Sequence, residues 1–215
     1  MISPCKFPLA AALFGAALCV GCADSLPAAP TALNSLTTGG GAALLVGPEY
    51  ADVSTQGGGG VYAAAGASLV RQQSGLQARL TMPTPEPGSY VYPTGTTPGQ
   101  PEVFTLWIFV FNFPELCSDP CDLNDLGIDK PAQGGAYNGG GHVVGGPSLT
   151  IAGRIGVGET PFDHPTIDMA PLTHPETAVV HLAIAPHGEL DPAKLPNELR
   201  IPTGSPANWW VAMFH

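Results

Sequence analysis

The sequence predicts an all-β domain, either an antiparallel β-sandwich or, as the alternative, a β-barrel, with long loops rich in glycine and proline. The 28 glycines and 24 prolines of the 215-residue chain favour many turns. Charged residues make up only 11% of the chain, against about 25% in an average domain, which excludes coiled coils and long helical bundles. Short apolar segments separated by such turns are typical of sandwiches and barrels.

The clearest strand segments have a two-residue alternation of apolar and polar side chains or are rich in β-branched and aromatic residues. They are 76–82, 103–113, 148–157, 178–185 and 209–214. Segment 103–113 (VFTLWIFVFNF) is apolar on both faces, and this pattern predicts a strand that is covered on both sides.

Glycine and proline also predict the connections. Residues 83–100 are expected to form a long loop. Gly145, Gly146 and Pro147 predict a turn that folds 142–144 back against the strand 148–157 as a hairpin. Asp191 and Pro192 are typical of a helix start, and Pro196 is expected to keep that helix short.

The charge balance bears on partners. The chain has 7 Lys and Arg against 17 Asp and Glu, a net charge of −10 at pH 7. Protein contacts to nucleic acid depend mainly on cationic side chains at phosphates. The sequence therefore predicts no nucleic-acid partner.

Residues 1–21 have the organisation of a signal peptide. Lys6 is the basic start, and 7–20 form an uncharged apolar stretch. A membrane-spanning helix needs about 20 residues, so this stretch is too short to span and suits a signal-peptide core.

The residues around Cys22 resemble the lipobox of bacterial lipoproteins, because a small residue, Gly21, directly precedes the cysteine. The resemblance implies that Cys22 is acylated and anchors the mature chain to a membrane. The chain departs from the usual pattern at Cys19, where lipoboxes have leucine. Two alternatives stay open: simple secretion after cleavage behind Ala23, and an uncleaved anchor. An extracytoplasmic location is expected, as a membrane-anchored lipoprotein or, alternatively, as a periplasmic or secreted protein.

The rest of the chain divides by composition. Residues 22–60 are rich in Ala, Pro, Gly, Ser and Thr and show no sustained period. They are expected to form a flexible tether, and 61–215 are expected to form a single β domain.

Five cysteines are present. Processing would remove Cys5 and Cys19 and use Cys22, which leaves Cys117 and Cys121. In an oxidising compartment this pair predicts a disulfide, with two free buried thiols as the alternative.

Three segments resemble a group of exported bacterial proteins of unknown function. They are FTLWIFVFNFPELC (104–117), Cys121 with DLNDLG (122–127), and VVHLAIAPHG (179–188). The shared motifs are F-N-x-P-x-x-C, a second nearby Cys with an acidic turn, and V-H-L-x-I-x-x-H-G. The chain differs in its longer proline-rich segment 83–100 and its glycine-rich 134–146. The resemblance implies export and a β fold, and it implies no activity.

An acidic turn behind the cysteines is a candidate metal site. Its hard oxygen ligands, which suit Ca²⁺, would come from Asp119, Asp122, Asn124, Asp125 and Asp129. Leu126 and Gln133 stand where an EF-hand needs oxygen ligands, so an EF-hand is excluded. The alternative is a cluster of Asx turns whose side chains cap local backbone amides.

His181 and His187 form a candidate polar site. They share a face of one predicted strand but lie roughly 20 Å apart at 3.3 Å per residue, too far to share a metal ion in a straight strand. The alternative is that both are structural, hydrogen-bonded histidines. A hydrolase would pair one of them with a carboxylate such as Asp163 or Asp168.

No nucleophile motif of the G-x-S-x-G type and no phosphate-binding loop is present. The aromatic face of Trp107, Phe109 and Phe111 is predicted to be core, or an apolar ligand groove. The sequence thus predicts an exported, lipid-anchored envelope protein that acts as a non-catalytic binding or structural module. The alternatives are a Ca²⁺-binding extracytoplasmic protein and a secreted hydrolase.

Overall fold

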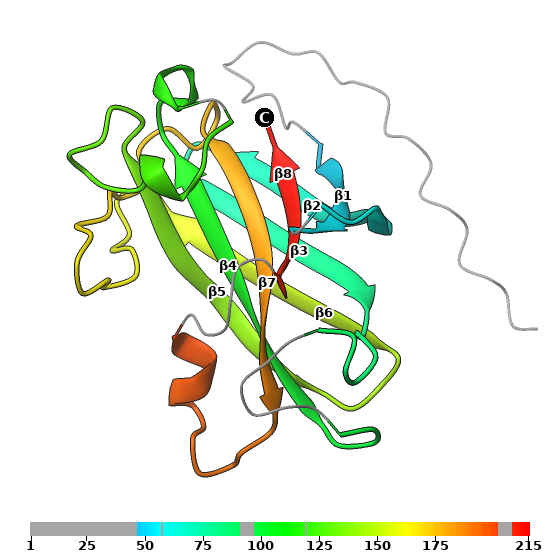
Figure 1. Ribbon diagram of the computed structural model, residues 1–215. Helices are drawn as coiled ribbons and strands as arrows, with labels where there is room; N and C mark the ends of the chain where they lie inside the picture. Colours follow the sequence, from blue (N-terminus) through cyan, green and yellow to red (C-terminus); the bar gives the residue numbers. More distant parts are fainter. Residues whose placement is uncertain (1–46, 57, 91–96, 119, 202–207) are drawn as a thin grey trace, which may run out of the picture. The chain divides into compact units, whose positions relative to one another are not determined.

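Eight antiparallel strands form one sheet in the computed structural model, which describes residues 47–215 apart from 57, 91–96, 119 and 202–207 (Figure 1). The strands are β1 Glu49–Thr55, β2 Val61–Gln72, β3 Gly75–Pro83, β4 Glu102–Phe111, β5 Gly134–Val144, β6 Ser148–Gly156, β7 Val179–Glu189 and β8 Trp210–Phe214. The helical turns of the described part are the 3₁₀ segments η1 Pro114–Leu116, η2 Leu123–Asp125 and η3 Asn197–Arg200. The predicted all-β fold is confirmed.

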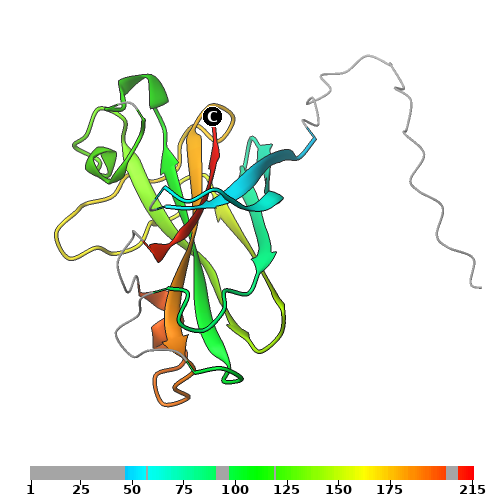
Figure 2. The same cartoon turned by 45° about the vertical axis from the view of Figure 1, so that its right-hand side comes forward.

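The sheet is nearly closed into a barrel. Its strand order is β5-β4-β7-β8-β1-β2-β3-β6, so β5 and β6 are the edges. The two halves of the sheet join at β8 and β1, which pair at Ser54–Val211 and Thr55–Trp210. The edges meet where Gly153 of β6 faces Gly139 of β5, since a Cβ on Gly153 would lie 2.5 Å from the Gly139 carbonyl oxygen. Figure 2 shows β1 and β2 (blue to cyan) crossing the direction of β7 (orange).

Strand β4 is buried on both faces, as its sequence predicts. Phe104, Leu106 and Ile108 are fully buried in the interior between the two halves of the sheet. Trp107 and Phe111 point to the outer face, where they are also buried. Burial of a large apolar side chain stabilises the fold by about 2–3 kcal/mol, so β4 stabilises both layers of packing.

The sheet begins earlier than the composition suggests. Strand β1 lies inside the segment 22–60 that is predicted to be a tether, so the domain boundary at residue 61 is wrong. Val53 is fully buried, and Glu49 Oε1 accepts a 2.6 Å hydrogen bond from Arg71 Nε. The alanine- and glycine-rich composition around β1 concealed these long-range contacts. Residues 22–46, Cys22 and the signal peptide 1–21 lie outside the described residues.

Two predicted connections differ. Residues 142–144 do not form a hairpin with β6; they pair with β4, where His142 is the partner of Phe104. Strand β6 pairs instead with β3 along its whole length. The helix expected directly after Asp191 forms later, as η3, with Pro196 as its N-cap. Proline lacks a backbone N–H and is best tolerated at a helix start.

Candidate ligand-binding site

The outer face of β4, β7 and β8 is apolar where a sheet face in water would be polar. Trp107 of β4, Ala183 of β7 and Val211 of β8 are register partners across the three strands. Alternate residues of a strand point to opposite faces, and the other set fills the interior. The connections 112–133 and 157–178 cover this outer face, and Leu126 and Phe162 from them pack on it.

The first connection is held by a disulfide and a capped 3₁₀ turn. Cys117 and Cys121 are joined, which confirms the predicted disulfide. The carboxylate of Asp125 accepts hydrogen bonds from Ser118 Oγ (2.9 Å), the Ser118 amide (3.1 Å) and the Asp122 amide (3.0 Å). Asp122 and Asp125 thereby form a capping box around η2.

The electrostatics of Asp125 support this turn. Burial acts to raise the pKa of its carboxyl, but the hydrogen bonds from Asp122 and Ser118 outweigh burial and lower the pKa. The group is therefore ionised at neutral pH and holds the turn closed.

The same contacts engage the oxygens that the calcium hypothesis assigns to an ion. Asp122 Oδ1 accepts from the Asn124 amide at 2.7 Å, and Asp122 Oδ2 accepts from Asn124 Nδ2 at 3.1 Å. Asp129 is exposed further along the connection, and Asp119 lies outside the described residues. Within the described ranges, no group of three or more histidine, cysteine or carboxylate side chains is placed to hold a metal ion.

Asn112 joins the two connections that cover the outer face. Its Nδ2 donates to the carbonyls of Gln133 and Pro171, both at 2.9 Å. Its Oδ1 accepts from the amides of Thr173 (2.8 Å) and His174 (3.3 Å). The side chain is 2% exposed, so it makes four hydrogen bonds out of contact with water.

Two adjoining cavities open between the outer face and these connections. The first has a volume of about 160 Å³ and is lined by residues that include Phe111, His181 and Met213. The second has a volume of about 240 Å³ and is lined by residues that include Trp107, Phe162 and Met169. Phe109, Leu123 and Trp209 line both cavities. We refer to the two cavities together as the aromatic groove.

The walls of the aromatic groove are ordered by ring contacts. Phe109 and Trp209 stack with their centroids 6.5 Å apart and an interplanar angle of 29°. Trp107 and Phe162 meet edge to face, 5.1 Å apart at 77°. Both are favourable aromatic geometries. No described lysine or arginine lines either cavity, and Asp122 contributes a carboxylate to the lining of the first. An anion is therefore disfavoured, and the mostly apolar lining suits an uncharged apolar molecule.

Polar nitrogens without partners gather in these walls. Trp107 Nε1, Trp209 Nε1 and His181 Nε2 are buried, and none of them has a hydrogen-bond partner among the described residues. An unmade hydrogen bond at a buried polar group costs about 1–3 kcal/mol. Of the five such side-chain atoms in the described part of the chain, three belong to groove residues. The polar nitrogens of the groove walls are thus left without protein partners.

The two candidate histidines lie in different surroundings. His181 packs on Phe111 with centroids 5.3 Å apart, and burial, followed by the nearby charge of His215, lowers its pKa to about 4. His187 is fully buried near the other end of β7, where its Nε2 lies 2.7 Å from Thr105 Oγ1. Burial lowers the pKa of His187 to about 4 as well. The structure does not bring the two histidines into one site.

The hydrolase hypothesis needs a histidine beside a carboxylate. Neither Asp163 nor Asp168 forms an ion pair with a histidine in the part of the chain that the structure describes. His181 Nε2, the better placed nitrogen, has no partner at all among those residues. No observation therefore favours acid–base catalysis over binding.

Sequence reasoning found one wall of the groove and missed the others. Trp107, Phe109 and Phe111 are visible as a second apolar face of one strand. Phe162 and Met169 come from a segment without periodicity. Asn112 is the second residue of the F-N-x-P-x-x-C motif, but the motif does not show which groups the side chain bonds. Met213 lies in the last predicted strand, 209–214, and the alternation of that strand is a signal that could have placed it on the same face as its partner His181.

Comparison with known proteins gives no relatives: no family model, curated protein or solved structure matches the chain. Among the described residues, no helix has the length and apolar character to cross a membrane.

Proposed function

We propose that this protein is an exported, lipid-anchored module of the cell envelope that binds a small apolar molecule in the aromatic groove. The signal-peptide pattern of residues 1–21 and the lipobox-like Gly21-Cys22 support export and anchoring to a membrane. The disulfide between Cys117 and Cys121 fits an oxidising compartment.

The observation that carries the binding proposal is the pair of adjoining aromatic cavities. Ligand sites are concave and mostly apolar with a few polar groups, and their volumes begin at about 300 Å³. The two cavities together exceed this lower limit, and their floor is the sheet. The disulfide and the η2 cap hold one wall, so little ordering is needed on binding, and preorganisation of this kind favours affinity.

Binding is tested with N-phenylnaphthylamine, an uncharged fluorophore whose emission rises in apolar surroundings. Leu123 and Ile128 are each 48% exposed on the same connection, but only Leu123 lines the cavities. We expect Leu123→Ser to weaken binding about tenfold and Ile128→Ser to leave it unchanged. Equal binding by both variants, or no binding by the wild type, refutes the groove as the site.

The anchor is tested separately by mass spectrometry of the mature N-terminus in the native host. An acylated Cys22 supports the proposal. A free amino group at Asp24 contradicts lipidation and leaves secretion, and it does not affect the groove assay.

A further inference from the structure

Negative charge surrounds the aromatic groove. The connections 112–133 and 157–178, which cover the outer face, carry nine of the 17 Asp and Glu residues of the chain and one of its 7 Lys and Arg residues. They therefore hold most of the net charge of −10. A cleft with low-dielectric walls concentrates the field of charges of one sign and attracts molecules of the opposite charge. The groove is thus placed to attract a cation.

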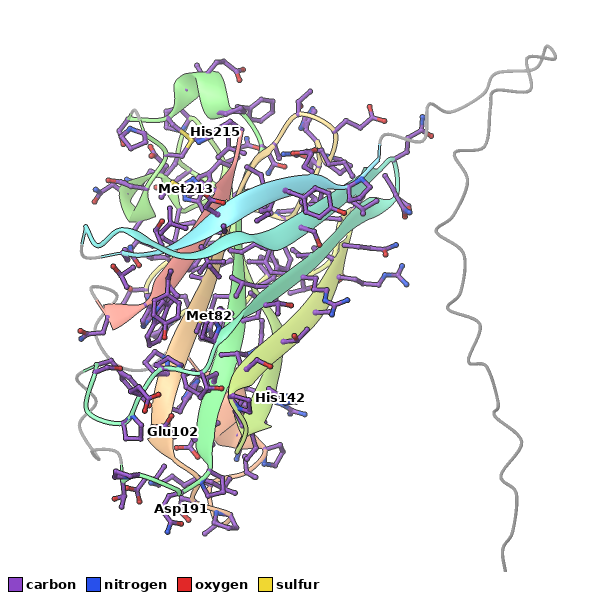
Figure 3. The ribbon with its side chains drawn as sticks, turned by 90° about the vertical axis from the view of Figure 1, so that its right-hand side faces the viewer. Met82, Glu102, His142, Asp191, Met213 and His215 are labelled. Carbon is purple, nitrogen blue, oxygen red and sulfur yellow. A yellow bond between two sulfur atoms is a disulfide. The ribbon has the colours of Figure 1, made fainter. Side chains whose placement is uncertain are left out.

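One of these carboxylates belongs to the groove itself. Asp122 lines the first cavity and is exposed to solvent. Met213, which also lines that cavity, is 42% exposed, and Figure 3 labels it near the end of β8. The first cavity therefore opens to water beside Asp122. The two oxygens of the Asp122 side chain each accept one hydrogen bond from Asn124. A carboxylate can accept about four hydrogen bonds, so both oxygens can still meet a cation.

The rings of the first cavity suit the same charge. Phe109, Phe111 and Trp209 line it together with Asp122. A cation over the face of an aromatic ring is attracted by the ring quadrupole, and ammonium groups with apolar substituents are recognised by sets of such rings. No lysine or arginine of the described residues lines either cavity to oppose a cation. The rings and the carboxylate therefore favour a cationic group that is attached to an apolar body.

We propose that the molecule bound in the aromatic groove is a cationic amphiphile, an apolar body that carries one ammonium group. The body fills the groove, and the ammonium group lies at the opening beside Asp122. A metal ion is a poorer occupant, because the described residues bring no three histidine, cysteine or carboxylate side chains together to hold one. The inference rests on the proposed function, since it names the ligand class of the same groove.

The test compares three naphthalene compounds of similar size: naphthylmethylamine, which is cationic, naphthylmethanol, which is uncharged, and naphthoate, which is anionic. Each competes with N-phenylnaphthylamine for the full-length mature protein at about pH 8, where ordinary histidines are neutral. The amine is expected to bind about tenfold more tightly than the alcohol, because it gains the carboxylate and the ring faces. Naphthoate is expected to bind more weakly than the alcohol. Added NaCl should weaken binding of the amine and leave that of the alcohol unchanged, because salt screens charges.

The variant that tests the position of the ammonium group is Asp122→Asn. It removes the charge, and asparagine keeps the side-chain oxygen that caps η2. The matched control is Asp129→Asn, the same change on the same connection, because Asp129 is exposed and lines neither cavity. We expect Asp122→Asn to weaken binding of the amine about tenfold and to leave that of the alcohol unchanged. Asp129→Asn should keep the preference of the wild type for the amine, and melting curves verify that both variants are folded.

Two results would overturn the inference while the groove remains a binding site. One is equal affinity of the wild type for the amine and the alcohol, which needs no variant to be folded. The other is the same loss of amine binding in Asp122→Asn and Asp129→Asn, which would mean that the amine responds only to net charge. Absence of N-phenylnaphthylamine binding to the wild type refutes the groove itself, so failure of the proposed function is distinguished from failure of the ligand class.

Discussion

Replacement of Asn112 by alanine tests whether one side chain holds the cover over the outer face. The change removes four hydrogen bonds, two to the carbonyls of Gln133 and Pro171 and two from the amides of Thr173 and His174. A hydrogen bond contributes about 1 kcal/mol net, and buried groups left unpaired cost more. We therefore expect Asn112→Ala to lower the free energy of unfolding by about 4 kcal/mol.

The measurement is urea unfolding followed by tryptophan fluorescence, with the disulfide intact, supported by a thermal melt. For a domain of this size, 1 kcal/mol corresponds to about 2–4 °C in Tm, so a fall of roughly 8–16 °C is expected. The matched control is Asn138→Ala. Asn138 also bonds the backbone, to Leu199 O and from Gly140 N, but it is exposed, and water can replace those bonds. Its loss should cost less than about 1 kcal/mol. If Asn112→Ala costs no more than Asn138→Ala, the two connections are not held by Asn112 and the reasoning fails.

Two further predictions concern the contact between the edge strands β5 and β6 and the effect of low pH on the stability of the protein. Gly153→Ala should lower the free energy of unfolding by about 2–3 kcal/mol, because its Cβ would lie 2.5 Å from Gly139 O, whereas Gly145→Ala, with open space around it, should be neutral in the same urea experiment. The pKa of His187 is about 4 in the folded protein, below the ordinary histidine value of 6.5 that the unfolded chain has. The unfolded chain therefore binds more protons between these values, and stability falls as pH drops from 6.5 to 4. We expect His187→Gln to remove up to about 3 kcal/mol of that fall and His142→Gln, on the exposed part of β5, to leave it unchanged; parallel pH profiles for the His187 variant and the wild type would contradict the burial argument.

The fold class can be predicted from the sequence because the apolar pattern that marks a strand is local. The apolar run 103–113 shows both that β4 is a strand and that its outer face is covered. The sequence does not predict strand β5, because its glycine-rich segment has low β propensity. It pairs with β4 along its whole length, and the close approach of Gly139 and Gly153 lets it meet β6, which a pair of larger residues would prevent. Tertiary contacts therefore override the low local β propensity of β5.

The candidate site depends on long-range contacts more than the fold class does. In the sequence, Asn112 is only a residue near the end of a predicted strand. Its hydrogen bonds to the two connections form because residues 133 and 171–174 lie beside it in the fold. The acidic turn can be interpreted as either an ion site or a set of caps, and only the positions of Ser118 and Asp122 show that the Asp125 carboxylate is bonded within the turn. Local composition sets which chemistry is present, and the pairing of distant strands sets which groups meet.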